Sequence, residues 1–209
     1  MTLSSRREVP LAALADIKPG YPFRGAITPD PDGEARVVQV RHLDPVTGFE
    51  TPVNPDTFDR VALSGKRQPD YLQPGDLLFV SRGTRFFAAV VPETIPPFTV
   101  CSPHFFLIRL TQEALGVLTP DFLAWQMNHH DIQVTLTRLG QGTLQHSVSK
   151  TQLKTLPITL PSLKQQRLIT AYQRAARDEA DALQALILNR DQEVRALGSA
   201  VLAEARAAR

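Results

Sequence analysis

The chain has 209 residues, of which 43% are hydrophobic and 21% charged, with a formal net charge of +2. These values predict a folded protein with a sizeable core, and any basic surface must be local because the total charge is small. Cys101 is the single cysteine, which excludes an intramolecular disulfide and a cysteine metal cluster and suits a reducing cytoplasm. No apolar run reaches the roughly 18 residues of a membrane span, so we expect a soluble cytoplasmic protein with no membrane contact.

The first half of the chain contains short apolar runs separated by proline and glycine, without a helical pattern between them. Such runs are typical of buried strands, which we expect near residues 9–19, 35–43, 77–80, 85–93 and 98–110. Residues 44–70 are rich in proline and glycine and show little periodicity, which predicts a long surface loop. Successive strands without helices between them favour a curved, mostly antiparallel sheet or a partly open barrel.

The hydrophobic pattern becomes helical at Thr119, a residue type that caps helix N-termini, and Pro120 suits the first helical position. We expect one helix from there to Gly140, a residue type that ends helices. Its apolar stripe is expected to be core and not a ligand site, and consists of Phe122, Trp125, His129, Ile132, Leu136 and Leu139.

Two capping-box spacings follow, Ser149 with Gln152 and Ser162 with Gln165. They predict a short helix from about Lys150 and a long helix from about residue 163, with a strand or extended connector at 156–161.

Residues 163–208 contain no proline, which predicts a single helix of about 40 residues. A helix of that length cannot bury its apolar seam against a domain of this size, so we expect a coiled-coil contact with another chain. The seam consists of Ile169, Tyr172, Ala176, Leu183, Leu186, Ile187, Val194, Leu197 and Val201. The sequence thus predicts an α+β protein: a curved-sheet domain with short helices at 1–161 and a long coiled-coil helix at 162–209.

Catalytic and metal-binding patterns are missing from the sequence. His129, His130 and Asp131 are adjacent on a predicted helix, where neighbours point about 100° apart and cannot chelate one ion together. There is no glycine-rich phosphate loop, nucleophile elbow or adenosylmethionine fingerprint. We therefore expect no catalysis, no metal and no cofactor in this chain, and an inert packed thiol at Cys101.

Between Asp131 and Asp178 there is no acidic residue, although seven Lys and Arg residues lie in that interval. Such a stretch is either a solvated helix surface or a site for an anion. Arginine and glutamine can pair with base edges, while lysine and hydroxyl groups suit phosphate oxygens. The candidate DNA-binding residues are Arg24, Lys66, Arg67, Arg82, Arg85, Arg138, Gln141, Thr143, Gln145, His146 and Lys150.

The order of these segments resembles the DNA-specificity subunits of type I restriction-modification systems. Residues 16–23 are similar to the opening of a target recognition domain, residues 72–84 to its central strand and turn, and residues 118–123 to its later helix. The strongest resemblance is Leu156-Pro157-Ile158-Thr159-Leu160-Pro161 followed by Gln165-Gln166 and a long helix.

The resemblance implies a non-catalytic subunit that reads part of a split DNA sequence and serves phage defence. It implies binding to double-stranded DNA, to a DNA adenine methyltransferase subunit and through it to a restriction and translocase subunit. S-adenosylmethionine, ATP and magnesium are expected only in those partners.

This chain has one recognition domain and one long helix where the usual subunit has two of each. We therefore expect a half-length subunit whose homodimer reads a palindromic split site, although a truncated remnant would share the same sequence features. A scaffold protein whose sheet domain binds another protein is the alternative from a different functional class.

Overall fold

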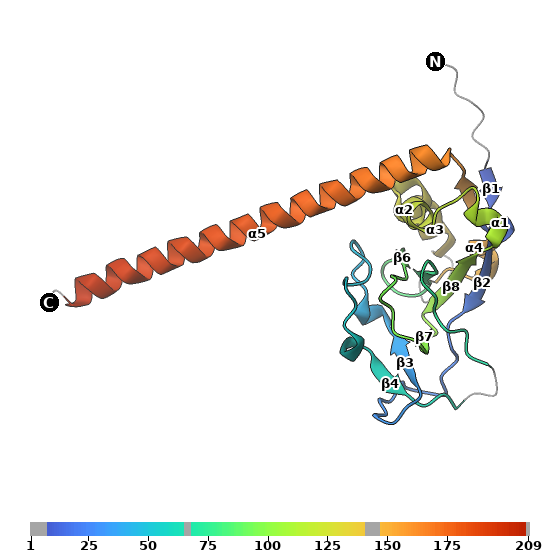
Figure 1. Ribbon diagram of the computed structural model, residues 1–209, viewed down its shortest axis with the longest axis horizontal. Coiled ribbons are helices and arrows are strands. Elements are labelled where there is room, and N and C mark those ends of the chain that lie inside the picture. The colour runs from blue at the N-terminus through green and yellow to red at the C-terminus, as the bar shows by residue number, and fades with distance from the viewer. Residues whose placement is uncertain (1–7, 65–67, 141–146, 208–209) are drawn as a thin grey trace, which may run out of the picture. The chain divides into compact units, whose positions relative to one another are not determined.

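The computed structural model describes residues 8–64, 68–140 and 147–207 (Figure 1). Contacts divide the chain into an N-terminal unit, residues 1–167, and a C-terminal helical unit, residues 168–209. The N-terminal unit contains every strand described, and the helical unit consists of the greater part of one helix.

A four-stranded antiparallel sheet lies at the centre of the N-terminal unit. Its strand order is β2 (Ala15–Pro19), β8 (Phe105–Leu110), β5 (Leu77–Val80) and β6 (Phe87–Val90). All four residues of β5 are buried, as the continuous apolar sequence predicts for a central strand.

Two smaller sheets complete the β-structure, and none of the three closes into a barrel. The first has the order β4 (Asp59–Val61), β3 (Ala35–Val38) and β7 (Thr99–Cys101), with β3 and β7 parallel. The second pairs β1 (Glu8–Pro10) with β9 (Pro157–Thr159). The predicted α+β class and open, mostly antiparallel β-structure are confirmed.

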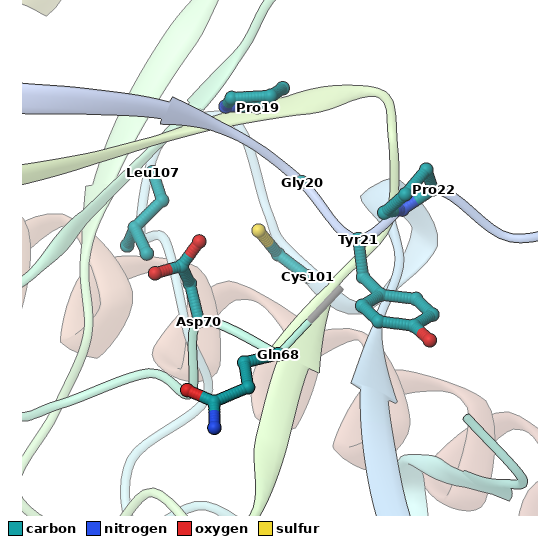
Figure 2. Close-up of a pocket in the computed structure, with 8 residues that line it drawn as sticks. All are labelled: Pro19, Gly20, Tyr21, Pro22, Gln68, Asp70, Cys101 and Leu107. Carbon is teal, nitrogen blue, oxygen red and sulfur yellow. The ribbon is translucent and has the colours of Figure 1, made fainter. Parts of the chain in front are cut away.

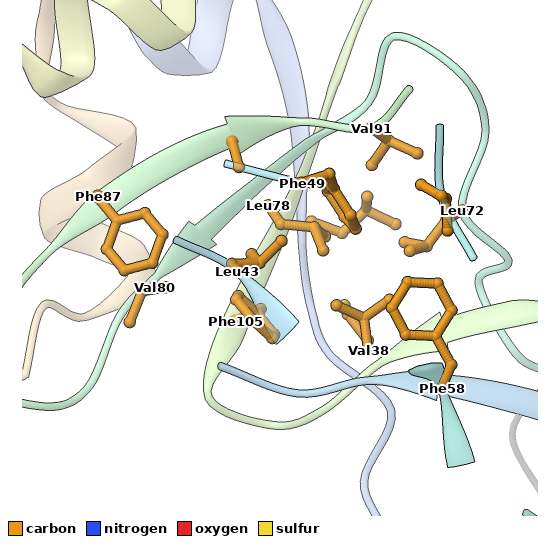
Figure 3. Packing of buried hydrophobic residues seen from close by; sticks show 14 residues of the cluster. Val38, Leu43, Phe49, Phe58, Leu72, Leu78, Val80, Phe87, Val91 and Phe105 are labelled. Atoms are coloured by element: carbon orange, nitrogen blue, oxygen red, sulfur yellow. The ribbon is translucent and has the colours of Figure 1, made fainter. Parts of the chain in front are cut away.

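The main core lies between the four-stranded and three-stranded sheets, where Leu78 and Phe105 meet Val38 (Figure 3). Phe49 and Phe58 are also buried in this cluster, at 6% and 5% exposure. The prediction that residues 44–70 form only a surface loop is therefore wrong. Phe49, Val53 and Phe58 are buried at irregular spacing, whereas Val46 is 59% exposed.

Four short helices follow or precede these strands. They are α1 (Gln112–Leu115), α2 (Pro120–Asn128), α3 (His130–Gly140) and α4 (Lys150–Lys154). Thr119 caps α2 by accepting a hydrogen bond from Phe122 N at 3.3 Å, and Ser149 forms the predicted capping box with Gln152 at the start of α4.

The expected single helix from Thr119 to Gly140 is wrong, because His129 has an extended backbone with φ −69° and ψ 147°. The interruption is stabilised locally: Gln133 Nε2 donates to the Met127 carbonyl at 2.7 Å, which would otherwise lose its helical partner. Both pieces still bury apolar side chains, so the hydrophobic pattern alone does not reveal the break.

The longest element is α5 (Leu163–Ala207), a helix of 45 residues. It starts with the predicted capping box, in which Ser162 N donates to Gln165 Oε1 at 3.0 Å and Gln165 N donates to Ser162 Oγ at 3.3 Å. No helix among the described residues is both long and apolar enough to cross a membrane.

Candidate nucleic-acid interface

Several loops leave the same end of the four-stranded sheet. Val80, the last residue of β5, is paired with Phe105 at the start of β8 and with Phe87 at the start of β6. Ser81 N then donates to His104 O at 2.9 Å, and Gly20 N donates to Phe105 O at 3.0 Å. The loop at 81–86, the turn before β8 and the chain leaving β2 are thereby held next to one another.

The end of α3 and the beginning of α4 join this group through backbone contacts. Arg82 forms a β-bridge with Ser147, and Val148 N donates to Ser81 O at 3.0 Å. Gly140 lies against Phe86, because a Cβ at Gly140 would come within 2.9 Å of two atoms of that ring. We call residues 81–86, 138–140 and 147–150 the loop end of the sheet.

Four candidate residues from distant parts of the sequence are brought to the loop end. Arg82 and Arg85 are exposed on the loop between β5 and β6, Arg138 is exposed in the last turn of α3, and Lys150 is half-buried at the first position of α4. None of the ion pairs among the described residues includes these four cations. Their positive charges are therefore not compensated by carboxylates of the described part of the chain.

The remaining candidates lie elsewhere. Arg24 is exposed in the loop after β2, next to Phe23, which packs beside the three-stranded sheet in a cluster with Tyr21 and Val61. Lys66, Arg67, Gln141, Thr143, Gln145 and His146 lie outside the described residues. Residues 141–146 connect two parts of the loop end.

A buried ion pair fixes the turn that precedes β5. Asp76 is 2% exposed and accepts from Arg109 Nε at 2.7 Å and from Arg109 Nη2 at 2.6 Å. The same carboxylate accepts from Gln73 N at 2.7 Å, closing the turn over Pro74 and Gly75. The hydrogen bond to Asp76 raises the pKa of Arg109. Sequence reasoning recognised the turn residues. It missed Arg109, because Arg109 lies far from Asp76 in the sequence and no local spacing connects the two residues.

A second polar network surrounds the exposed Arg41 near the three-stranded sheet. Its guanidinium contacts the Asp59 carboxylate, Gln39 Oε1 at 3.1 Å and His42 Nε2 at 3.1 Å. Gln39 N approaches the other ring nitrogen of His42 at 3.1 Å, and a neutral imidazole can accept at only one nitrogen. Burial, with a smaller contribution from Arg41, lowers the pKa of His42. Sequence reasoning missed this network, because Asp59 lies in β4, far from Arg41 in the sequence.

A small hollow lies beside Gly20 and is lined by Tyr21, Asp70 and Cys101 among others (Figure 2). Its volume of about 10 Å³ leaves room for roughly one water molecule. Burial raises the pKa of Cys101 to about 12, so the thiol stays protonated, as expected for an inert packed cysteine. No group of three or more metal-binding side chains occurs among the residues described.

No protein-family model and no curated protein matches the sequence, but solved structures do. One, reported for complex assembly and conformational transition of the type I R-M system, is 18% identical with a TM-score of 0.62 and covers 91% of this chain. The HsdS subunit from Thermoanaerobacter tengcongensis is 18% identical, with a TM-score of 0.57 over 85% of this chain. The S subunit of the type I system from M. genitalium is 14% identical, with a TM-score of 0.51 over 90%.

The chain has the fold of a type I S subunit. It spans 43%, 38% and 44% of the lengths of those three chains, respectively. The similarity thus extends over most of this chain, which agrees with the resemblance seen in the order of the sequence segments.

Proposed function

We propose that this chain recognises a DNA sequence as the specificity subunit of a type I restriction-modification assembly. The observation that carries the proposal is the loop end, where cations from three separate segments, none paired with a carboxylate of the described residues, lie together in a fold shared with S subunits. Arg138 and Lys150 are suited to phosphate oxygens, and Arg82 to a guanine edge, because arginine can donate two parallel hydrogen bonds.

The chain itself has no catalytic role in this proposal. Methylation and cleavage belong to partner subunits, and so do S-adenosylmethionine, ATP and magnesium. An adenine methyltransferase subunit is the direct protein partner, and a restriction subunit joins through it.

A homodimer supplies the second recognition unit and the second long helix. The chain covers less than half of each similar S subunit, and its long helix exposes large apolar side chains such as Leu183, Leu197 and Tyr172. Two copies related by a twofold axis would read a palindromic split site, with equal half-sites in opposite orientation.

The test is binding to a fluorescent random-sequence duplex and to a duplex selected from a random library, each over a salt series. Phosphate contacts predict a log-log slope of about −0.9 for each phosphate neutralised, and base reading predicts tighter binding to the selected duplex. The assay is run with and without the cognate methyltransferase. Undetectable binding at low salt under both conditions would contradict the proposal and favour a protein-binding scaffold.

A further inference from the structure

Phe98 combines two unfavourable features in the turn that precedes β7. Its backbone has a φ of 57°, in the left-handed region that turns normally fill with glycine or asparagine. Its side chain is a large apolar ring, and this ring is 59% exposed. Neither feature stabilises the fold, and backbone strain of this kind is concentrated at functional sites.

The backbone around Phe98 is fixed by hydrogen bonds to neighbouring segments. Phe98 O accepts from Arg36 N of β3 at 3.0 Å, and Thr99 O accepts from Leu72 N at 2.8 Å. The buried Thr99 Oγ1 donates to Pro96 O at 2.7 Å, which closes the turn. The Phe98 ring is therefore presented at the surface by a backbone that these bonds hold in place.

Other aromatic rings lie beside Phe98 on the three-stranded sheet. The Tyr71 ring contacts the Phe98 ring edge to face, with 5.4 Å between the ring centroids and 82° between the ring planes. Tyr71 and Phe23 are half-buried against one apolar cluster, which contains Tyr21 and Val61. We call Phe23, Tyr71 and Phe98 the aromatic surface.

Arginines without carboxylate partners accompany the aromatic surface. Arg24 follows Phe23 directly and is exposed. Arg36 of β3 lies opposite Arg60 of β4, so two like charges face each other across the strands, which is unfavourable without an anion. The Nε of Arg36 is also buried without a hydrogen-bond partner. In the part of the chain that the structure describes, no ion pair includes these three arginines.

The carboxylates of the same strands and loops accept from other groups. Asp59 contacts Arg41, and Glu34 Oε1 accepts from Leu63 N at 2.9 Å. The surface around Phe98 thus offers flat rings together with positive charge.

The exposed apolar area at Phe98 has the size of one flat ring. Val46, Leu115 and Val117 are the other large apolar side chains described as exposed in the N-terminal unit, and none of them packs against the cluster beneath the aromatic surface. A specific protein interface buries roughly 800 Å² on each partner, with several apolar side chains at its centre. A single ring flanked by cations instead matches one nucleobase and its neighbouring phosphates.

We propose that Phe98 stacks on an unstacked nucleobase of bound DNA, with Tyr71 supporting the ring and Arg24 close to the backbone phosphates. The inference rests on the proposed function and adds a contact outside the loop end. Residues of the loop end would read the edges of paired bases, whereas Phe98 contacts the face of a base. That face is accessible only where the base has left the stack, as in duplexes that apolar side chains distort.

The test compares two fluorescein-labelled DNAs, a random-sequence duplex and the same duplex with one bulged base. Anisotropy titrations at low salt are run with and without the cognate methyltransferase. The wild-type chain is expected to bind the bulged duplex about tenfold more tightly, because stacking on one base contributes about that factor. Equal affinity for the two duplexes would overturn the proposal.

Substitutions of Phe98 separate stacking from folding. Phe98→Gly removes the ring and accepts the positive φ without strain, so it should lose the tenfold preference while its affinity for the paired duplex changes less than about twofold. Phe98→Tyr should keep the preference. The matched control is Val46→Ala, because Val46 is also 59% exposed, and it should leave both affinities unchanged. Urea unfolding followed by Trp125 fluorescence verifies that each variant is folded. An equal loss in Phe98→Tyr and Phe98→Gly would refute stacking.

Photo-cross-linking tests the contact without any substitution. The bulged base is replaced by 5-iodouracil, the complex is irradiated, and the modified peptide is identified by mass spectrometry. Attachment at Phe98 is expected, and attachment confined to residues outside the aromatic surface would contradict the proposal.

The salt series on the selected duplex tests the proposed function separately. A chain that prefers its selected duplex but not the bulged one refutes the stacking and not the proposed function, and a chain with only the second preference does the opposite. Loss of methyltransferase binding in Phe98→Gly, with both DNA affinities unchanged, would assign the ring to a protein contact and overturn the inference.

Discussion

The N-terminal unit and the helical unit bury their apolar side chains to very different degrees. Leu78, Phe79 and Phe105 in the N-terminal unit are fully buried, while Leu183, Val194 and Leu197 on α5 are 55%, 63% and 67% exposed. The first unit has the core it needs and leaves cations exposed at its loop end. The described part of the second unit is one helix whose large apolar side chains are exposed, and we expect association to cover them. The comparison distinguishes residues that stabilise the fold from residues available for contacts with other molecules.

The largest expected effect is on the folding of the N-terminal unit. Replacing Asp76 with alanine leaves the Arg109 charge without its partner and should lower the unfolding free energy by about 3 kcal/mol. Trp125 on α2 is the single tryptophan of the sequence. Its fluorescence during urea unfolding therefore measures the stability of the N-terminal unit. The exposed Glu93→Ala serves as control and should shift the value by less than about 0.5 kcal/mol. Equal shifts in the two variants would show that the ion pair does not hold the turn.

Substitutions in the seam of α5 should weaken dimer formation without changing the stability of the N-terminal unit. Leu197→Glu places a charge in the seam of both copies and should raise the dimer dissociation constant by about 100-fold. Sedimentation equilibrium measures the constant, and Trp125 fluorescence should show an unchanged unfolding midpoint. Leu188→Glu is the matched control, because Leu188 is 54% exposed but does not belong to the seam. A similar loss in both variants would contradict the assignment of the seam residues.

Substitutions at the loop end should change the affinity for DNA. Arg138→Glu or Lys150→Glu should weaken binding to every duplex by about tenfold at low salt, because phosphate contacts carry no sequence information. Changing Arg82 or Gln145 should instead alter the preferred sequence. Anisotropy titrations on selected and random duplexes measure both effects, with Arg206→Glu on α5 as control. Equal losses of affinity on the selected and the random duplex for all four changes would contradict this assignment. Arg138 and Lys150 would then not be limited to phosphate contacts, nor Arg82 and Gln145 to base contacts.

The smallest effects are expected from two glycines, with opposite signs. Gly140→Ala forces a contact with Phe86 and should cost about 1 kcal/mol, measured by Trp125 fluorescence during urea unfolding. A Cβ at Gly198 on α5 meets nothing within 4 Å, so Gly198→Ala should stabilise the helix by about 0.5–1 kcal/mol, measured by far-UV circular dichroism. A loss in both variants would mean that α5 packs closely around Gly198.

Local spacing in the sequence determined the starts of α2, α4 and α5 and the class of the fold. Thr119, Ser149 and Ser162 form caps with residues three positions away, so their contacts are within reach of sequence reasoning. The long helix was predictable for the same reason, since a proline-free stretch with one apolar seam needs no distant partner to identify it. The DNA-binding residues themselves remain predictions.

Contacts between distant residues were decided only by the tertiary structure. The burial of Phe49 depends on two sheets meeting around it. Arg82 and Lys150 come to one loop end because Val148 donates to Ser81. Sequence spacing determines neighbours along a helix or strand. Which surfaces then meet depends on the packing of the whole unit, and sequence patterns alone carry little information about it.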